Sequence, residues 1–117
     1  MTTQQFYSIG TPGKPWGKED KAAWLNQQTI KRSYQQQVLT KVEKIGQDLS
    51  ELLVVEQYGA LSYDPDAYPL CLIKTKHWQD QKPTVLITGG VHGYETSGVQ
   101  GALRFVETML DSYADTY

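Results

Sequence analysis

The stretch that most constrains this chain is TVLITGGVHGYETSGVQGALRF, residues 84–105. Its first half is an apolar run that ends in two glycines, and its second half repeats apolar residues at helical spacing. The first pattern predicts a β-strand that is buried on both faces, and the second predicts an amphipathic helix. In open α/β sheets, ligands bind beyond the carboxyl ends of the strands. The glycine turn between the two elements is therefore the first candidate for a functional site.

The composition excludes several classes of protein. The chain has 117 residues, of which 21% are charged, and its net charge is −2, with acids and bases mixed along it. These values indicate at most one ordinary globular domain, without the basic stripe that binds nucleic acid. No apolar run approaches the roughly 20 residues of a membrane helix, and the first residues lack the pattern of a signal peptide. We therefore expect no nucleic-acid partner, no membrane partner and a cytoplasmic location.

Helical spacing dominates the N-terminal half. Residues 1–18 contain several Gly and Pro and are predicted to form an N-terminal loop. Residues 19–45 are predicted to form one long helix that stops at Gly46. The apolar face of this helix repeats at spacings of three and four residues. Its predicted members are Ile30, Tyr34, Val38, Val42, Ile45 and Leu49.

The spacing of apolar residues changes in the second half. Branched residues predict strands at 52–59 and 70–76, and the Asp-Pro-Asp turn between them predicts a hairpin. A third strand is predicted at 84–90 and a helix at 98–110. The predicted apolar side of that helix consists of Val99, Leu103, Val106 and Leu110. The predicted fold class is α/β. Because such a layer needs more strands and helices on both faces, we expect the N-terminal part of a longer, incomplete domain.

The glycine turn admits a nucleotide site as one interpretation. It resembles the T-G-x-x-x-G-x-G turn of short-chain dehydrogenases, in which glycines let the backbone approach a dinucleotide. Thr88, Gly89 and Gly93 fit that pattern. Glu95, however, occupies the place of the last glycine, and a carboxylate there would repel a pyrophosphate. That turn also normally follows the first strand of its domain, whereas here two predicted strands precede it.

A metal site is the other interpretation, and it uses His92 and Glu95. A spacing of three residues places two side chains on the same side of a turn. An imidazole nitrogen and a carboxylate oxygen are both good zinc ligands. Glu95 also lies near the start of the predicted helix, where a carboxylate is electrostatically stabilised. The non-functional alternative is that the two side chains cap the helix and hydrogen-bond within the turn.

The segment TVLITGGVHGYETSGVQGALRFVE resembles the zinc-ligand segment of the zinc metallocarboxypeptidase family. In that family a strand leads into H-x-x-E, which supplies the first two of three protein zinc ligands, and a helix follows. The preceding EQYGALSYDPDAYPLCLIKT is similar to the family's first hairpin, and the helix before it to the family's opening helix. The resemblance covers residues 19–108 and is strongest over 83–107. It implies His92 and Glu95 as zinc ligands.

The resemblance also implies a fold and an activity. The fold would be the mixed-sheet, phosphorylase/hydrolase-like fold of zinc carboxypeptidases, with residues 19–117 as an N-terminal portion truncated before the third ligand. The activity would be zinc-dependent hydrolysis of an amide bond next to a C-terminal carboxylate, on a peptide or an N-acyl amino acid. The family's third ligand is a histidine downstream of H-x-x-E, and its catalytic glutamate lies further on. No histidine follows His92. We therefore expect no catalytic residue within this chain and an inactive fragment in isolation.

Two further interpretations stay open at this stage. A deacylase of the aspartoacylase and succinylglutamate-desuccinylase type shares H-x-x-E and the downstream histidine, so this segment does not separate it from a peptidase. A non-catalytic fragment that serves as an interaction module is the alternative from a different class. Missing neighbour strands would leave an apolar sheet edge exposed, so we expect self-association through that edge.

Four other side chains are assigned no function. His77 follows the second predicted strand and is expected to be a surface residue, and Trp78 beside it a packing aromatic. Arg104 lies on the predicted final helix and is expected to be solvated. Cys71 is the only cysteine, so it cannot form an internal disulfide, and it is expected to be a small buried side chain.

Overall fold

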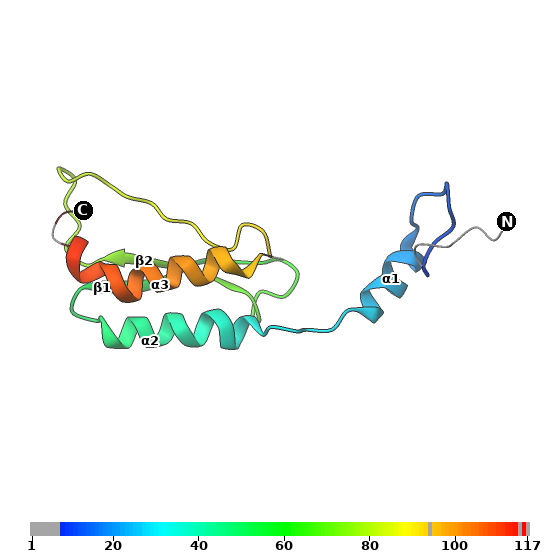
Figure 1. Ribbon diagram of the computed structural model, residues 1–117, viewed down its shortest axis with the longest axis horizontal. Coiled ribbons are helices and arrows are strands. Elements are labelled where there is room, and N and C mark those ends of the chain that lie inside the picture. The colour runs from blue at the N-terminus through cyan, green and yellow to red at the C-terminus, as the bar shows by residue number, and fades with distance from the viewer. Residues whose placement is uncertain (1–7, 94, 115, 117) are drawn as a thin grey trace. The chain divides into compact units, whose positions relative to one another are not determined.

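The structure is a computed structural model that describes residues 8–93, 95–114 and 116 (Figure 1). The chain divides into two units, Met1–Lys31 and Arg32–Tyr117. The first unit holds helix α1, Lys18–Gln27. Residues 8–17 precede it without regular helix or strand, as the predicted loop requires, and residues 1–7 of that loop lie outside the described part. Among the described residues, no helix combines the length and the apolar character needed to cross a membrane.

The prediction of one continuous helix over residues 19–45 is wrong. Helix α1 ends at Gln27, and Gln28 is already extended, with ψ at 142°. Helical structure resumes in the second unit at residue 34. Helices in proteins are stabilised mainly by packing an apolar face, and α1 has no buried residue. Ile30, placed on the predicted apolar face, is 80% exposed, so nothing offsets the low helix propensity of the adjoining β-branched Thr29 and Ile30.

The second helical stretch begins with a wide turn. A π-helical turn, η1 (Gln35–Leu39), leads directly into helix α2, Thr40–Asp48. The sequence predicts that the helix stops at Gly46, and this prediction is wrong, because Gly46 lies inside α2. A Cβ atom at Gly46 would lie 3.0 Å from Cγ2 of Val55. The helix therefore approaches the sheet closely at Gly46, and the lack of a side chain there serves packing instead of termination.

The predicted hairpin is confirmed. Strands β1 (Leu53–Ala60) and β2 (Pro69–Thr75) pair antiparallel, from Leu53 opposite Thr75 to Ala60 opposite Pro69. The register shifts between Gln57 and Gly59, where β1 carries a bulge. Asp64 closes the connecting turn, because its carboxylate accepts a hydrogen bond from the backbone N–H of Ala67 at 3.1 Å. The Asp-Pro-Asp stretch thus acts as the turn that its composition predicts.

A small apolar core joins the helices to the hairpin. Helix α3 (Thr96–Tyr113) and α2 lie side by side along it (Figure 1). The buried residues are Val42, Ile45, Leu53 and Leu103, and Val38, Leu49, Val99, Val106 and Leu110 pack around them. These residues include all four of the predicted apolar side of the last helix. They also include the predicted face of the earlier helix from Val38 onward, so that pattern is confirmed where it meets a sheet.

The predicted third strand, 84–90, is wrong for the described chain. Residues 83–90 have no regular secondary structure, and the described sheet has two strands. Within the described part, no backbone-to-backbone hydrogen bond involves residues 83–91. The apolar side chains of this run are exposed: Val85 56%, Leu86 77%, Ile87 47% and Val91 79%. Branched residues favour extended backbone, but a strand forms only where a second strand satisfies its N–H and C=O groups.

Candidate metal centre

A tight turn brings the two predicted zinc ligands together. Glu95 occupies the N-cap of α3 in an extended conformation, with φ −94° and ψ 91°. Its backbone N–H donates to the carbonyl oxygen of His92 at 3.2 Å, which closes the turn between them. Glu95 makes no side-chain capping hydrogen bond to the helix. The capping contact that the non-functional interpretation expects is therefore absent at Glu95, whereas the hydrogen bond within the turn that it also expects is present.

The two ligand atoms lie at a separation that suits a metal. Nδ1 of His92 and Oε2 of Glu95 are 3.2 Å apart. A zinc ion held by a nitrogen and an oxygen at about 2.1 Å, with tetrahedral geometry, places those two atoms about 3.4 Å apart. The same separation allows a hydrogen bond between the two side chains. Both side chains are well exposed, His92 at 73% and Glu95 at 70%, so solvent or further ligands can reach the space beside them.

Two glycines set the path of the chain into this turn. Gly90 has a φ of +82°, which a residue with a side chain adopts only under strain. A Cβ atom on Gly90 would lie 2.9 Å from Cγ2 of Val99, and one on Gly89 would lie 3.0 Å from the carbonyl oxygen of Gly98. The space beside both glycines is thus occupied by the first turns of α3. Their absent side chains serve close packing on the helix, and not the approach of a dinucleotide that the dehydrogenase pattern requires.

A comparison with known families gives a match to this chain. The family model of zinc carboxypeptidases matches residues 26–117. The chain belongs to the zinc carboxypeptidase family. The match includes the hairpin, the His92–Glu95 turn and α3, and it is consistent with the fold described above as part of such a domain. A comparison with curated proteins finds no match.

The family name implies a zinc ion, and the chain's donor set meets that requirement in part. His92 and Glu95 would supply one nitrogen and one oxygen ligand, and these two atoms lie at a suitable separation. Across residues 8–93, 95–114 and 116, no group of three or more His, Cys, Asp or Glu side chains is placed to bind a metal. The chain's other histidine, His77, is exposed, as predicted. The described donors would therefore fill two positions of a tetrahedral site.

The remaining side chains singled out from the sequence lie away from this pair. Arg104 is exposed, and its Nη1 donates to the Glu107 carboxylate at 3.3 Å, as expected for a solvated helix position. Trp78 is 54% exposed and donates through Nε1 to the Asp80 carboxylate at 3.2 Å, so it packs less than predicted. Cys71 is half-buried, and burial raises the pKa of its thiol. None of these side chains joins the candidate metal centre.

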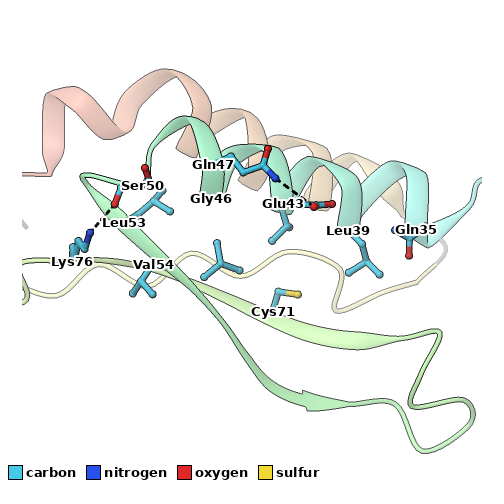
Figure 2. A pocket seen from close by; sticks show the side chains of 12 residues that line it. Gln35, Leu39, Glu43, Gly46, Gln47, Ser50, Leu53, Val54, Cys71 and Lys76 are labelled. Atoms are coloured by element: carbon cyan, nitrogen blue, oxygen red, sulfur yellow. Dashed lines mark hydrogen bonds between the residues drawn. The ribbon is translucent and has the colours of Figure 1, made fainter.

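Cys71 lies in a groove of about 660 Å³ between the η1–α2 stretch and the hairpin (Figure 2). Leu39, Leu53 and Cys71 form part of its apolar wall, and Glu43, Gln47 and Lys76 lie along its polar side. The side-chain amide of Gln47 donates to the Glu43 carboxylate. Nζ of Lys76 donates to the carbonyl oxygen of Ser50, just beyond the end of α2. No lining residue belongs to the His92–Glu95 turn or to α3. The groove is therefore separate from the candidate metal centre.

One contact at the metal turn has no counterpart in the sequence analysis. Nη1 of Arg32 donates to Oγ1 of Thr96 at 2.8 Å, across 64 residues of sequence. Thr96 directly follows Glu95 and is the first residue of α3. No local pattern marks Arg32, because Thr96 is brought to it only by the packing of the η1–α2 stretch against α3.

Proposed function

We propose that this chain carries part of the active site of a zinc-dependent carboxypeptidase, with His92 and Glu95 as two of its zinc ligands. The observation that supports this most directly is the 3.2 Å separation of Nδ1 of His92 and Oε2 of Glu95. It occurs in an exposed turn within the region that matches zinc carboxypeptidases. The substrate class would be peptides with a free C-terminal carboxylate.

The chemistry follows from what each group supplies. A zinc ion at this position would polarise the scissile carbonyl and lower the pKa of a bound water towards about 7. In this chain, His92 would hold the metal through a neutral imidazole, so protons and zinc would compete for the same nitrogen. Glu95 contributes negative charge at the positive end of α3, which stabilises the carboxylate. The high exposure of both side chains leaves open the positions that a further protein ligand and a substrate would occupy.

The chain by itself is proposed to bind zinc weakly and to lack peptidase activity. Two protein ligands do not close a tetrahedral site, and the third histidine and the catalytic glutamate that the family resemblance implies are not identified among these residues. The peptidase comes before the deacylase because the matching family is that of carboxypeptidases. A cytoplasmic location, the absence of nucleic-acid and membrane partners, and self-association remain part of the proposal.

Zinc competition against a chromogenic chelator tests the assignment of ligands. The unmodified chain should hold zinc weakly, and Glu95→Gln should lower its affinity because an amide brings no negative charge to the metal. His92→Ala should cost as much or more, since it removes a ligand outright. His77→Ala is the matched control and should change nothing, because that imidazole lies outside the site. Tight, nanomolar binding by the monomer that persists in His92→Ala would refute the assignment.

A further inference from the structure

Few contacts hold the segment that carries the predicted zinc ligands. Within the described residues, no backbone-to-backbone hydrogen bond joins residues 83–91 to other parts of the chain. Among the described residues of the turn that follows, the backbone hydrogen bond is the local one from the N–H of Glu95 to the carbonyl oxygen of His92. The Glu95 carboxylate has no capping contact with the helix. Apart from the turn and the 3.2 Å contact between the Glu95 carboxylate and His92, the adjoining first residue of α3 is what can fix the position of Glu95.

Arg32 holds that first residue. Its Nη1 donates to Oγ1 of Thr96 at 2.8 Å, and Thr96 is half-buried. Among the described ion pairs, none involves Arg32, so no carboxylate draws the guanidinium away from this contact. The planar guanidinium is pre-organised, so it loses less freedom per hydrogen bond than a lysine ammonium would. Arg32 therefore restrains the residue next to the Glu95 ligand.

The contact is the first of a row of polar contacts between the η1–α2 stretch, with the residues that precede it, and α3; this row is called the polar seam. One turn further along α3, Gln100 accepts a hydrogen bond from Nζ of Lys41 and donates to the carbonyl oxygen of Gln37 at 3.3 Å. Thr96 and Gln100 are four residues apart, so they lie on the same face of α3. Beyond Gln100 the seam gives way to the apolar core at Leu103. The Arg32 contact thus extends the polar contacts with α3 as far as the residue that follows the His92–Glu95 turn.

The position of Arg32 is poorly suited to a role in stability alone. The N-terminus of a helix carries a partial positive charge, so a guanidinium placed there is electrostatically unfavourable. The contact is exposed, and exposed polar contacts contribute little to folding. The contact does engage the hydroxyl of Thr96, which is joined to Glu95 by a peptide bond.

We propose that Arg32 is a positioning residue for the zinc ligand Glu95, acting through the hydroxyl of Thr96. The guanidinium holds Thr96, and this keeps the Glu95 carboxylate within ligand distance of His92. The inference rests on the proposed zinc site and adds to it a residue from a distant part of the chain.

The test uses Zn²⁺ alone, titrated into the metal-free chain, with the imidazole resonances of His92 and His77 followed by NMR. The His92 signals report binding at the site, and the His77 signals in the same spectra report non-specific binding. Arg32→Ala and Thr96→Val should each weaken binding at His92 about threefold to tenfold, somewhat less than loss of a group that contacts a ligand directly. The double variant should be no weaker than either single one, because both remove the same contact.

Conservative variants and a matched control separate positioning from folding. Thr96→Ser keeps the hydroxyl and should bind as the unmodified chain does, and Arg32→Lys should restore part of the affinity. Arg104→Ala removes the chain's other arginine, which lies on α3 as Thr96 does, and it should have no effect on zinc binding. Urea unfolding should give the same midpoint for Arg32→Ala, Thr96→Val and the unmodified chain. A lowered midpoint that accounts for the weaker binding would overturn the proposal in favour of a structural role.

The two hypotheses fail in different ways. If His92→Ala abolishes the zinc-dependent shifts while Arg32→Ala and Thr96→Val bind normally, the positioning role is refuted and the zinc site stands. If His92→Ala and Glu95→Gln leave zinc binding unchanged, the zinc site itself is refuted, and the positioning role is refuted with it.

Discussion

The hairpin strands and residues 83–91 have similar residue types and different structures. Both are short runs of branched apolar residues, yet β1 and β2 pair along their length while residues 83–91 make no backbone-to-backbone hydrogen bond within the described chain. Leu53 in β1 is 3% exposed, and Leu86 in the other run is 77% exposed. The difference shows that β-propensity sets only what a segment can become. A partner strand close in sequence, joined by a tight turn, makes the hairpin self-sufficient.

The sharpest way to test this contrast is to shorten one leucine in each region. Leu53→Ala removes a hairpin side chain that is 3% exposed in the core, and it should lower the free energy of unfolding by about 2–5 kcal/mol. Leu86→Ala removes one that is already exposed, and it should change that free energy by less than about 0.5 kcal/mol. Urea unfolding followed by circular dichroism measures both. Equal losses would mean that residues 83–91 contribute to the core in solution.

The exposed run should also drive association between copies of the chain. Leu86→Ser replaces an apolar side chain that would be buried in a pairing contact, and it should weaken self-association about tenfold, from roughly 1–2 kcal/mol of lost burial. Ile30→Ser is the control, since Ile30 is 80% exposed but lies outside this run. Sedimentation velocity over a range of concentrations measures the effect. A monomer at every concentration before any substitution would show that the run does not act as a pairing edge.

The contrast also extends to the glycines that guide the exposed run onto α3. Gly90→Ala forces a side chain into a backbone with φ at +82°, and it should cost about 1–2 kcal/mol of unfolding free energy. Gly93→Ala places its methyl group in open space and should be nearly neutral. Thermal unfolding of the two variants provides the comparison. If both are neutral, the run is not held against α3 in solution.

The smallest expected effect concerns Cys71 on the hairpin. Burial raises the pKa of its thiol, so at a given pH the folded chain holds less of the reactive thiolate than the unfolded chain does. The rate of alkylation by iodoacetamide should therefore rise with pH through a higher midpoint in the folded chain than in urea. A raised folded pKa contributes stability below the unfolded pKa, and that contribution is lost as the pH rises through the folded value. Coincident rate profiles would contradict the burial of the thiol.

The candidate site was predictable from the sequence only in its local part. The pair His92 and Glu95 could be named because three residues separate them, and the turn that joins them needs no distant partner. The role of Gly89 and Gly90 was not predictable, because the atoms that exclude their side chains belong to α3. Arg32 was missed for the same reason, since 64 residues separate it from Thr96.

The sequence by itself determined the hairpin and the His-x-x-Glu turn, because the partners of each lie within a few residues of it. It also determined the apolar face of α3, because the helical spacing of apolar residues is itself a local pattern, although the residues on which that face packs are distant in sequence. Only the tertiary structure decided where the long predicted helix breaks and which part of it packs. It also decided that residues 84–90 stay unpaired and that Arg32 meets the start of α3. The physical reason is that burial and backbone pairing depend on distant segments, whose arrangement local periodicity does not specify.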